Sequence, residues 1–600
     1  MTKEFRYAWT WELASSPEEI WSLVSDANRF DRDLGLPPVE LIETINGVRR
    51  VKFRTTLVNF EWEEEPFEWI SPYRFGIVHR YKMGPIAEMR VDARLEHLQP
   101  TGTRLTYDVT AKSANVLGNA FIPIMVGVIG KKRFGDAAKE YDLIASNDGL
   151  IVKTMKGGKL SATRRSNLKI QMERLKEKGA DDAILNRLFD FLDHADDLSL
   201  QRMKPYALAD IWNLPRRAAL ETFLRATRLG VLDMYWDLLC PKCRSVTEDI
   251  ANLKDVHATS HCEVCQIDFT ANFDHNIEVI FRPNISVRPV DAAAEFCIGS
   301  PQNQPHIVFS MIVQPDEEMS LSTMLEEGRY FLRASGIDGS QPLLAVKDGA
   351  KKIKLRAKDT GWSQDMAETG LMPYLNLINE TERALTFELV RTEWSDKAAT
   401  AADVTTLQVF RDLFSSEVFR PGEEISIGST VLMFTDLRNS TRLYREIGDA
   451  SAFRRVREHF EILERAVAAE GGAVVKTIGD AIMATFRSPS AAIRAIWDVQ
   501  KELTNRGEPI LFIKVGIHQG PCILVNLNER LDYFGSTVNI ASRLSGFSKG
   551  GEIIFSKEIH DDPEVKAFLE QNSSPNSITR FDGDIRGYDQ PMQLWQVKMR

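Results

Sequence analysis

Apolar and polar positions in the last third of the chain change repeatedly between strand-like and helix-like spacing. An apolar run that begins at Val431 ends at Asp436, which places a carboxylate at the end of a predicted strand. The next stretch carries apolar residues three or four positions apart, the spacing of a helix that packs one face on a sheet. This apolar stripe consists of Phe453, Val456, Phe460, Leu463 and Val467.

The same change of spacing continues beyond residue 470. Residues 474–486 form two strand-like stretches that meet at a Gly-Asp turn, Gly479 and Asp480. A second helical stripe follows at 493–503 and another apolar strand at 513–517. The predicted order is βαββαβ, the ferredoxin-like arrangement, within a domain over residues 429–600.

The first part of the chain, residues 1–145, predicts an α+β domain. Ser16, Pro17 and Glu19 form a helix-start signature after a stretch in which aromatic and polar residues alternate. Several strands follow, and an apolar run at 121–130 predicts a buried helix near the end of this domain. The strands are expected at 51–58, 75–81 and 104–109.

This element order resembles that of the START-like helix-grip family, in which a curved sheet surrounds an apolar cavity. The resemblance implies a domain that binds an apolar small molecule. A domain with a filled core and no ligand is the alternative. An enzyme in this part of the chain is disfavoured, because no nucleophile or acid-base pair is recognisable there.

Between these two regions the pattern changes again, so we expect a multidomain α+β protein. Residues 150–239 are helical in spacing and allow a winged-helix-like unit without a dense basic face, which favours a scaffold over DNA binding. Residues 276–398, beginning with a strand at 277–281, have the short alternating strands of a β-sandwich. Residues 399–428 form a linker in which 400–419 is interpreted as one helix.

Length and charge narrow the class of protein. A chain of 600 residues exceeds one hydrophobic core, and a net charge of -10 is small for that length, which disfavours a surface that coats nucleic acid. No signal peptide is recognisable, and the run at 121–130 is about half of the roughly 20 residues that a membrane span needs. We therefore expect a cytoplasmic protein without a membrane span.

Four of the six cysteines form two Cys-x-x-Cys pairs. Cys240 and Cys243 are separated by 18 residues from Cys262 and Cys265, a spacing that lets two knuckles close a tetrahedral four-cysteine site. Because thiolates suit zinc, we predict a zinc ribbon over residues 240–275 that holds one structural Zn²⁺. A redox dithiol is the alternative, although it needs only one of the two pairs.

Three sequence blocks carry the strongest signal. FTDLRNST at 434–441, KTIGDAIMATF at 476–486 and DYFGSTVNIASRL at 532–544 resemble, in this order, three signature blocks of the class III nucleotidyl cyclases. The resemblance covers about residues 430–600 and implies cyclisation of a nucleoside triphosphate. One departure is Asn439, where the family usually has glycine, but asparagine tolerates the positive φ that glycine supplies.

Such a reaction lets the ribose 3′ oxygen attack the α-phosphate and expel pyrophosphate. Two carboxylates that share two divalent cations stabilise the charge on the attacking and leaving oxygens. Asp436 and Asp480 are the candidates for these carboxylates. The alternative for each is an ordinary turn residue without a metal. By resemblance, the main-chain carbonyl of Leu437 completes the shell of two Mg²⁺ or Mn²⁺ ions per site. The main-chain amides that follow Asp436 suit the phosphates.

Asn539 and Arg543 are four residues apart on a predicted helix, so both project from one face. By resemblance, Asn539 orients the ribose and Arg543 stabilises the pentavalent phosphate. Arg586 stands where the family usually has a lysine that binds the triphosphate, and arginine keeps the charge but changes the geometry. A capping asparagine and a solvated arginine are the alternative for the helical pair.

The choice of base is the sharpest expectation from the resemblance. In this family the residue before Thr477 and the residue seven before Asn539 read the purine, and here they are Lys476 and Asp532. A Lys/Asp pair is similar to the adenine-reading members, since lysine donates to a ring nitrogen and aspartate accepts from the exocyclic amine. Guanine leaves both groups with mismatched partners.

The sequence thus favours an adenylate cyclase that converts ATP to 3′,5′-cyclic AMP and pyrophosphate and is regulated by upstream domains. In the family, the metal aspartates and the base and transition-state residues of one site come from opposite subunits, which implies a homodimer. A guanylate cyclase is an alternative that Lys476 and Asp532 oppose. A non-catalytic nucleotide-binding regulator is another, although such a protein would normally have lost a key residue.

Overall fold

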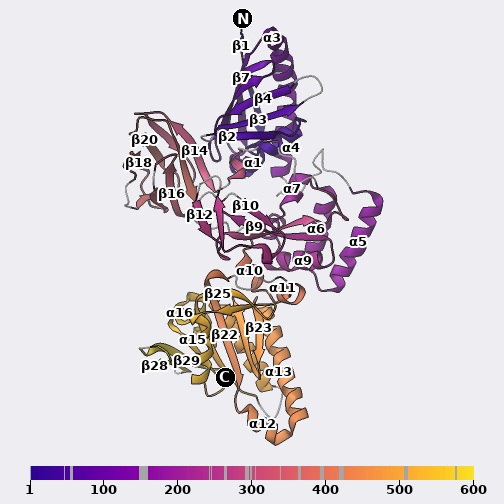
Figure 1. Cartoon of the computed structure of the whole chain (residues 1–600), viewed down its shortest axis with the longest axis vertical. Coiled ribbons are helices and arrows are strands. Elements are labelled where there is room, and N and C mark those ends of the chain that lie inside the picture. The colour runs from indigo at the N-terminus through magenta and orange to yellow at the C-terminus, as the bar shows by residue number, and fades with distance from the viewer. Residues whose placement is uncertain are drawn as a thin grey trace.

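The computed structural model describes residues 2–599 apart from short internal segments. In Figure 1 the N-terminal strands lie at one end of a long molecule, the C-terminal sheet lies at the other, and the helices α5 to α9 lie between them. Within the described residues, no helix combines the length and the hydropathy that a bilayer span requires. The segments that are not described are 46–47, 55–58, 147–159, 242–243, 245, 263–266, 291–295, 298–299, 305, 338, 363–365, 392–397, 416, 418–423, 506–510, 574–576 and 589.

The N-terminal region is an antiparallel sheet accompanied by helices at both ends of its sequence. The strand order is β1-β8-β7-β6, and β6 pairs onward with β4, which leads to β3 and β2. The predicted helix start is confirmed, because Ser16 Oγ accepts from the Glu19 amide at 3.3 Å and Glu19 Oε2 accepts from the Ser16 amide at 2.7 Å. The elements are β1 (Glu4–Leu13), α1 (Pro17–Val24), α2 (Ala27–Asp33), β2 (Glu40–Ile45), β3 (Val48–Arg54), β4 (Asn59–Glu64), β5 (Glu68–Ile70), β6 (Arg74–Met83), β7 (Ile86–His97), β8 (Thr103–Ser113), α3 (Val116–Ile122), the π-helix η1 (Pro123–Gly130) and α4 (Lys131–Ser146).

The apolar run at 121–130 differs from the expected buried helix. It forms the end of α3 and the π-helix η1, and no residue of η1 is fully buried. Ile124 and Val128 are 57% and 69% exposed, whereas Phe121, Val126 and Ile129 border a cavity inside the N-terminal region. The run is apolar on both sides, so covering the cavity with one side leaves the other in solvent.

The region after residue 300 is a two-sheet arrangement with its own apolar core. One of its sheets continues the N-terminal sheet, because β14 pairs with β5 through Phe309↔Ile70 and Ser310↔Trp69. Trp69 Nε1 also donates to the Ile307 carbonyl at 3.0 Å. The elements are η3 (Pro301–Asn303), β14 (Ile307–Val313), β15 (Glu318–Ser322), β16 (Gly328–Ala334), β17 (Gln341–Ala345), β18 (Lys352–Ala357), β19 (Ala367–Thr369), β20 (Tyr374–Asn379) and β21 (Leu385–Arg391).

The middle region is helical and then changes to short strands. The strand expected to open the β-sandwich is β13, but it pairs with β9 of the middle region, because its nearly continuous buried face extends that region's core. The elements are α5 (Ala162–Glu177), α6 (Asp182–His194), α7 (Asp197–Gln201), α8 (Pro205–Trp212), α9 (Arg216–Arg228), β9 (Leu232–Leu239), β10 (Val246–Ile250), η2 (Leu253–Asp255), β11 (Thr259–Cys262), β12 (Ile267–Thr270) and β13 (Ile277–Pro283).

The linker was predicted as one helix, and this prediction is wrong. It contains two short helices, α10 (Ala401–Thr405) and α11 (Gln408–Leu413), separated by an extended Leu407. The hydroxyl groups of Thr405 and Thr406 donate back to main-chain carbonyls one turn earlier. Such local bonds compete with a continuing helix.

The C-terminal region has the predicted βαββαβ order in β22, α13, β23, β24, α14 and β25. Its sheet runs β23-β24-β22-β25-β27-β29-β28, and α13 and α14 bury their apolar stripes against one face. Phe453 is an exception within the predicted stripe at 63% exposure. The elements are β22 (Glu424–Leu437), α12 (Ser440–Ile447), α13 (Asp449–Ala469), β23 (Ala473–Ile478), β24 (Ala481–Phe486), α14 (Pro489–Asn505), β25 (Ile513–Leu527), β26 (Arg530–Phe534), α15 (Ser536–Leu544), η4 (Ser545–Phe547), β27 (Glu552–Ser556), α16 (Lys557–Asp561), α17 (Pro563–Asn572), β28 (Ile578–Gly583) and β29 (Met592–Lys598).

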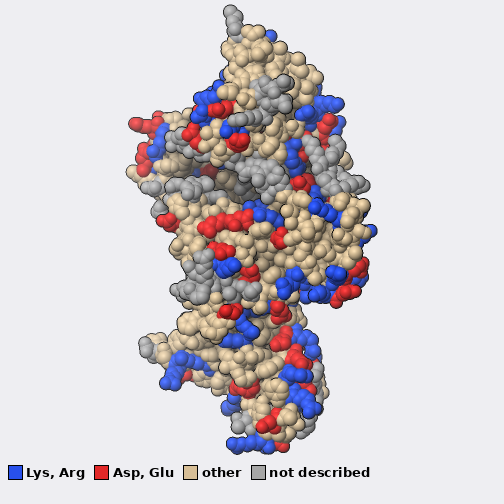
Figure 2. Space-filling view, turned by 45° about the vertical axis from the view of Figure 1, so that its right-hand side comes forward, with Lys and Arg blue, Asp and Glu red and all other residues tan. Residues whose placement is uncertain are grey.

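Basic and acidic residues are interspersed over the face shown in Figure 2, in line with the small net charge of -10. One charged cluster is buried between the N-terminal and middle regions. Arg29 and Arg32 of α2 donate to the two oxygens of Asp196 at 2.8 and 2.7 Å, and the Asp196 side chain is 3% exposed. Burial raises the pKa of Asp196, but the two guanidinium groups outweigh it and hold that pKa well below its ordinary value.

We expect Asp196→Asn to lower the free energy of unfolding by about 3 kcal/mol, because two buried cations lose the carboxylate that they share and keep only Asp26 and Asp33. A carboxyl with a depressed pKa stabilises the fold above the unfolded value of about 4 and loses that contribution as pH falls through the folded value. The difference from wild type should therefore shrink below about pH 4 in denaturant titrations. Asp182→Asn, which breaks an exposed pair with Lys176, is the matched control and should cost under about 1 kcal/mol. Equal effects of the two substitutions would refute the assignment.

Candidate active site

Two carboxylates lie at one end of the C-terminal sheet. Asp436 is the penultimate residue of β22, and Asp480 occupies the turn between β23 and β24, where Gly479 has φ +65°. β22 pairs with β24 as far as Thr435↔Ile482, so Asp436 lies beside the turn that carries Asp480. Asp480 Oδ2 is enclosed and has no hydrogen-bond partner among the described residues.

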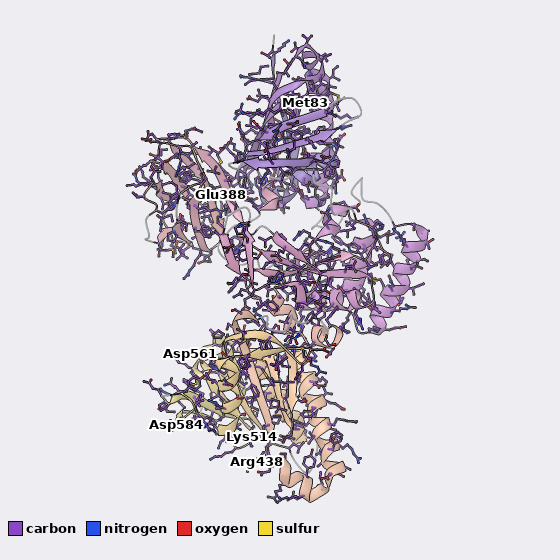
Figure 3. All side chains as sticks on the ribbon, in the orientation of Figure 1. Met83, Glu388, Arg438, Lys514, Asp561 and Asp584 are labelled. Carbon is purple, nitrogen blue, oxygen red and sulfur yellow. The ribbon has the colours of Figure 1, made fainter. Side chains whose placement is uncertain are left out.

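Lys514 of β25 contacts this carboxylate pair, and sequence reasoning did not single it out. It is paired with Asp436 across β22 and β25, and its Nζ lies 3.0 Å from Asp436 Oδ2. Figure 3 labels Lys514 beside Arg438, the residue that follows β22. One feature of the sequence could have indicated this position. Lys514 lies between Ile513 and Val515, which are buried, and a residue between two buried strand residues projects from the opposite face of the sheet.

The carboxylates fit divalent cations. The enclosed Asp480 Oδ2 is a hard oxygen without a partner, and an unpaired buried carboxylate oxygen is costly unless a cation neutralises it. No cluster of three or more His, Cys, Asp or Glu side chains occurs in the described part of the chain, so further ligands would have to be main-chain or substrate oxygens. Leu437, whose carbonyl the family resemblance assigns to the metal shell, is the last residue of β22.

Two neighbours shape the carboxylate end. Asn439 has φ +57° and ψ +35°, so the left-handed conformation expected at this departure from the family pattern is confirmed. It precedes α12, whose first main-chain amides follow Asp436. His459 of α13 is buried, and no described residue forms a hydrogen bond with either of its ring nitrogens. Burial lowers its pKa to about 4 against the opposing charge of Asp436, so the imidazole is neutral at pH 7.

The two residues expected to read the base are in contact. Lys476 Nζ of β23 lies 2.5 Å from Asp532 Oδ2 of β26, and Asp532 Oδ1 accepts from the Tyr533 amide at 2.8 Å. The Lys476 side chain is 38% exposed and that of Asp532 is 11% exposed, so the pair is accessible from the lysine side. Two residues far apart in sequence therefore form one donor and acceptor unit.

The linker helix α11 lies next to this pair. Gln408 Oε1 accepts from the Val474 amide at 2.8 Å, and Arg411 donates to the Leu531 carbonyl at 3.0 Å. A cavity of about 370 Å³ between α11 and β23 reaches Lys476 and Thr477. The linker is thus hydrogen-bonded to β23 and β26, the two strands that carry Lys476 and Asp532.

Asn539 and Arg543 share the exposed face of α15, while Ile540, Ala541 and Leu544 are buried. The expectation that the pair projects from one face is confirmed by this alternation of burial.

The turn that contains Arg586 lies beside α15. Arg543 Nη1 is 3.5 Å from the position that a Cβ on Gly587 would occupy, and Ile585 packs into the same apolar cluster as Ile540 and Leu544. Arg586 itself is exposed. Two arginines from distant parts of the sequence thus border one surface.

The carboxylate end and the arginine surface are not joined within the chain. Among the described residues, no hydrogen bond or ion pair links Asp436 or Asp480 to Asn539 or Arg543. The described residues thus show these two groups of candidate side chains without a direct polar contact between them.

The cysteine site is only partly described. Cys240 follows β9, Cys262 ends β11, and both are buried. Cys243 and Cys265 lie outside the described residues, so the four-cysteine zinc site remains a prediction.

Comparisons with known proteins identify the class of the C-terminal domain. Residues 423–579 match the family model of the adenylate and guanylate cyclase catalytic domain, and residues 165–327 match a family of unknown function, DUF5939. The chain therefore carries a class III cyclase catalytic domain. Its middle region is similar to a family to which no function is attached.

Curated relatives are similar over the catalytic domain. An adenylate cyclase of Mycosarcoma maydis is 34% identical over 160 residues, which are 22% of this chain and 6% of that protein. An adenylate cyclase of Lachancea kluyveri is 33% identical over 155 residues, 22% of this chain and 8% of that protein. A solved structure of adenylate cyclases from Trypanosoma brucei in their monomeric state is 21% identical, covers 28% of this chain and 89% of that chain, and has a TM-score of 0.25. The chain thus spans under a tenth of the length of these two curated relatives.

Proposed function

We propose that this protein is an adenylate cyclase that converts ATP to 3′,5′-cyclic AMP and pyrophosphate. The contact between Lys476 and Asp532 carries the proposal, because it places an amine donor and a carboxylate acceptor at one point. Adenine offers the complementary pair, a ring nitrogen and an exocyclic amine. Guanine has a ring N–H where adenine has the ring acceptor and a carbonyl where adenine has the amine, so the lysine would face a donor and the aspartate an acceptor, and such mismatches discriminate by orders of magnitude.

The reaction needs a new bond between the ribose 3′ oxygen and the α-phosphorus while the bond to the β-phosphate oxygen breaks. Mg²⁺ or Mn²⁺ held by Asp436, Asp480 and the Leu437 carbonyl would neutralise charge on the attacking and leaving oxygens. Asn539 orients the ribose, and Arg543 stabilises the charge that develops on the α-phosphate oxygens. Arg586, next to Arg543, binds the β- and γ-phosphates, which depart as pyrophosphate while the α-phosphate stays in the cyclic product.

We further propose that two chains share each active site. The support is that no hydrogen bond or ion pair joins Asp436 or Asp480 to Asn539 or Arg543 among the described residues of one chain. A homodimer brings the carboxylate end of one chain to the arginine surface of the other, and a two-fold axis creates two such sites.

Turnover by purified protein with ATP or GTP, each with Mg²⁺ or Mn²⁺, tests the proposal. Cyclic AMP from ATP, with GTP a poor substrate, is expected. Faster turnover of GTP would favour a guanylate cyclase. Nucleotide binding without any product would favour a non-catalytic regulator.

The four cysteines lead to a separate expectation of one structural zinc per chain. Metal analysis after a mild chelator wash should give about one zinc per chain, since a shared ion accounts for two pairs at ribbon spacing. Cys243→Ser should abolish zinc binding and destabilise the middle region. Cys297→Ser, at a buried cysteine elsewhere, is the control that should retain the zinc. A folded wild-type protein without zinc would contradict the prediction.

For the N-terminal region we propose ligand binding in the START-like manner. The support is a largely apolar cavity that is lined by the sheet and by helices α2, η1 and α4.

A further inference from the structure

The N-terminal cavity has a volume of about 270 Å³, close to the lower end of the roughly 300–1,000 Å³ of ligand pockets. Its walls are mainly aromatic and aliphatic. Phe30 and Phe134 meet edge to face at 4.7 Å between centroids, and Tyr107 stacks on Phe30 at 6.0 Å. The π-helix η1 covers one side, and π-helical turns are rare and frequent at functional sites.

One carboxylate in this apolar wall has no partner. Asp31 of α2 borders the cavity, and no hydrogen bond or ion pair reaches its side chain from the described residues. Its neighbours on α2 behave differently, because Arg29 and Arg32 point to Asp196 of the middle region. Burial raises the pKa of Asp31 to about 8, and the charges of Glu64 and Asp26 add to the effect. The fold therefore keeps a carboxyl group where apolar packing alone would exclude it.

Further polar atoms near Asp31 are also unsatisfied. Tyr107 Oη, on a lining residue, is buried without a hydrogen-bond partner among the described residues, and His79 Nε2 has only a long contact with Glu64. Glu64 Oε1 is in the same state, although Glu64 has longer ion pairs with His79 at 3.5 Å and Arg49 at 3.7 Å. Several unsatisfied polar atoms around one cavity indicate a missing polar group in an otherwise apolar ligand.

The charged residues around the cavity indicate whether the polar group of the ligand is cationic or anionic. The basic residues of the lining are His79, which pairs with Glu64, and Arg133, whose guanidinium donates to the Leu34 carbonyl. An anionic head would add to the negative charges of Glu64 and Asp26 that already disfavour ionised Asp31, whereas a cationic head stabilises the Asp31 carboxylate, lowers its pKa and lies among aromatic rings that attract cations.

We propose that this cavity binds an elongated apolar molecule with one ammonium head, and that Asp31 accepts the hydrogen bond of that head. The apolar part replaces water along the aromatic wall, and the head supplies the partner that Asp31 lacks. The inference rests on the ligand binding proposed above for the N-terminal region and does not use cyclase activity, so it and the proposed adenylate cyclase activity can fail independently.

Calorimetric titration of the full chain with decylamine, 1-decanol and decanoate tests the proposal, because the three probes share one alkyl chain. Decylamine should bind with a stoichiometry of one and at least about tenfold more tightly than 1-decanol, with decanoate weakest. Equal or tighter binding of 1-decanol or decanoate would overturn the proposal, as would failure of all three to bind.

Asp31→Asn keeps the shape and removes the charge. It should weaken decylamine binding by at least about tenfold and leave 1-decanol binding nearly unchanged. Asp136→Asn, an exposed aspartate on α4, is the matched control and should leave all three affinities at wild-type values. Unchanged decylamine affinity in folded Asp31→Asn protein would also overturn the proposal. The order of the three probes on wild-type protein remains decisive if Asp31→Asn does not fold.

Discussion

Mixing two inactive variants, Asp436→Ala and Arg543→Ala, is expected to restore cyclic AMP formation to about a quarter of the wild-type rate. Each variant alone should lose about 10²–10³-fold or more, because one lacks a metal-binding carboxylate and the other lacks the cation at the reacting phosphate. In a mixed dimer one site collects both defects. The other site receives intact aspartates from one chain and intact Asn539 and Arg543 from its partner.

The control uses two defects in the same residue set. Asp436→Ala mixed with Asp480→Ala leaves one lesion in every site, so activity should stay at background. Subunit exchange must be verified in both mixtures, for example with two differently tagged chains. If exchange occurs and the first mixture stays inactive, each active site is complete within one chain.

The second large effect concerns the base. Lys476→Glu combined with Asp532→Cys should lower ATP turnover by orders of magnitude and reverse the preference toward GTP, because both contacts to the purine are exchanged. The informative quantity is the ratio of kcat/KM for ATP to that for GTP, since imperfect packing around guanine lowers the absolute rate.

Arg530→Glu is the matched control for this exchange. Arg530 borders the cavity between α11 and β23. The substitution therefore reverses a charge near Lys476 without altering the proposed contact with the base. The ATP to GTP ratio should remain close to that of wild type. A ratio that moves equally in both variants would mean that local charge, and not base recognition, sets the preference.

Local signals predicted much of the fold and of the candidate site. The capping box at Ser16, the left-handed Asn439 and the shared face of Asn539 and Arg543 depend on a few consecutive residues, and each expectation is confirmed. The contact of Lys476 with Asp532 spans 56 residues, and the family pattern anticipated that they act together.

The features that sequence reasoning missed or predicted wrongly have a common physical cause. Each depends on residues that are distant in the sequence. Lys514 gains its place beside Asp436 only through the register of β22 and β25. β13 has the pattern of a sandwich strand, but the neighbour that it pairs with is decided by the core of the middle region. The run at 121–130 is apolar on both sides, and periodicity alone does not reveal that one side covers a cavity.

The pairing of β5 with β14 has a consequence for how this protein can be engineered. Main-chain hydrogen bonds join the strands of residues 4–113 to β14, β21, β16, β17 and β19 in one sheet, so a chain cut after residue 145 loses a strand neighbour as well as the N-terminal cavity. The uncovered edge of β14 would invite intermolecular pairing, and aggregation would then be mistaken for lost regulation. A sensor exchange between proteins of this kind should therefore transplant both segments together, with the junction after β21.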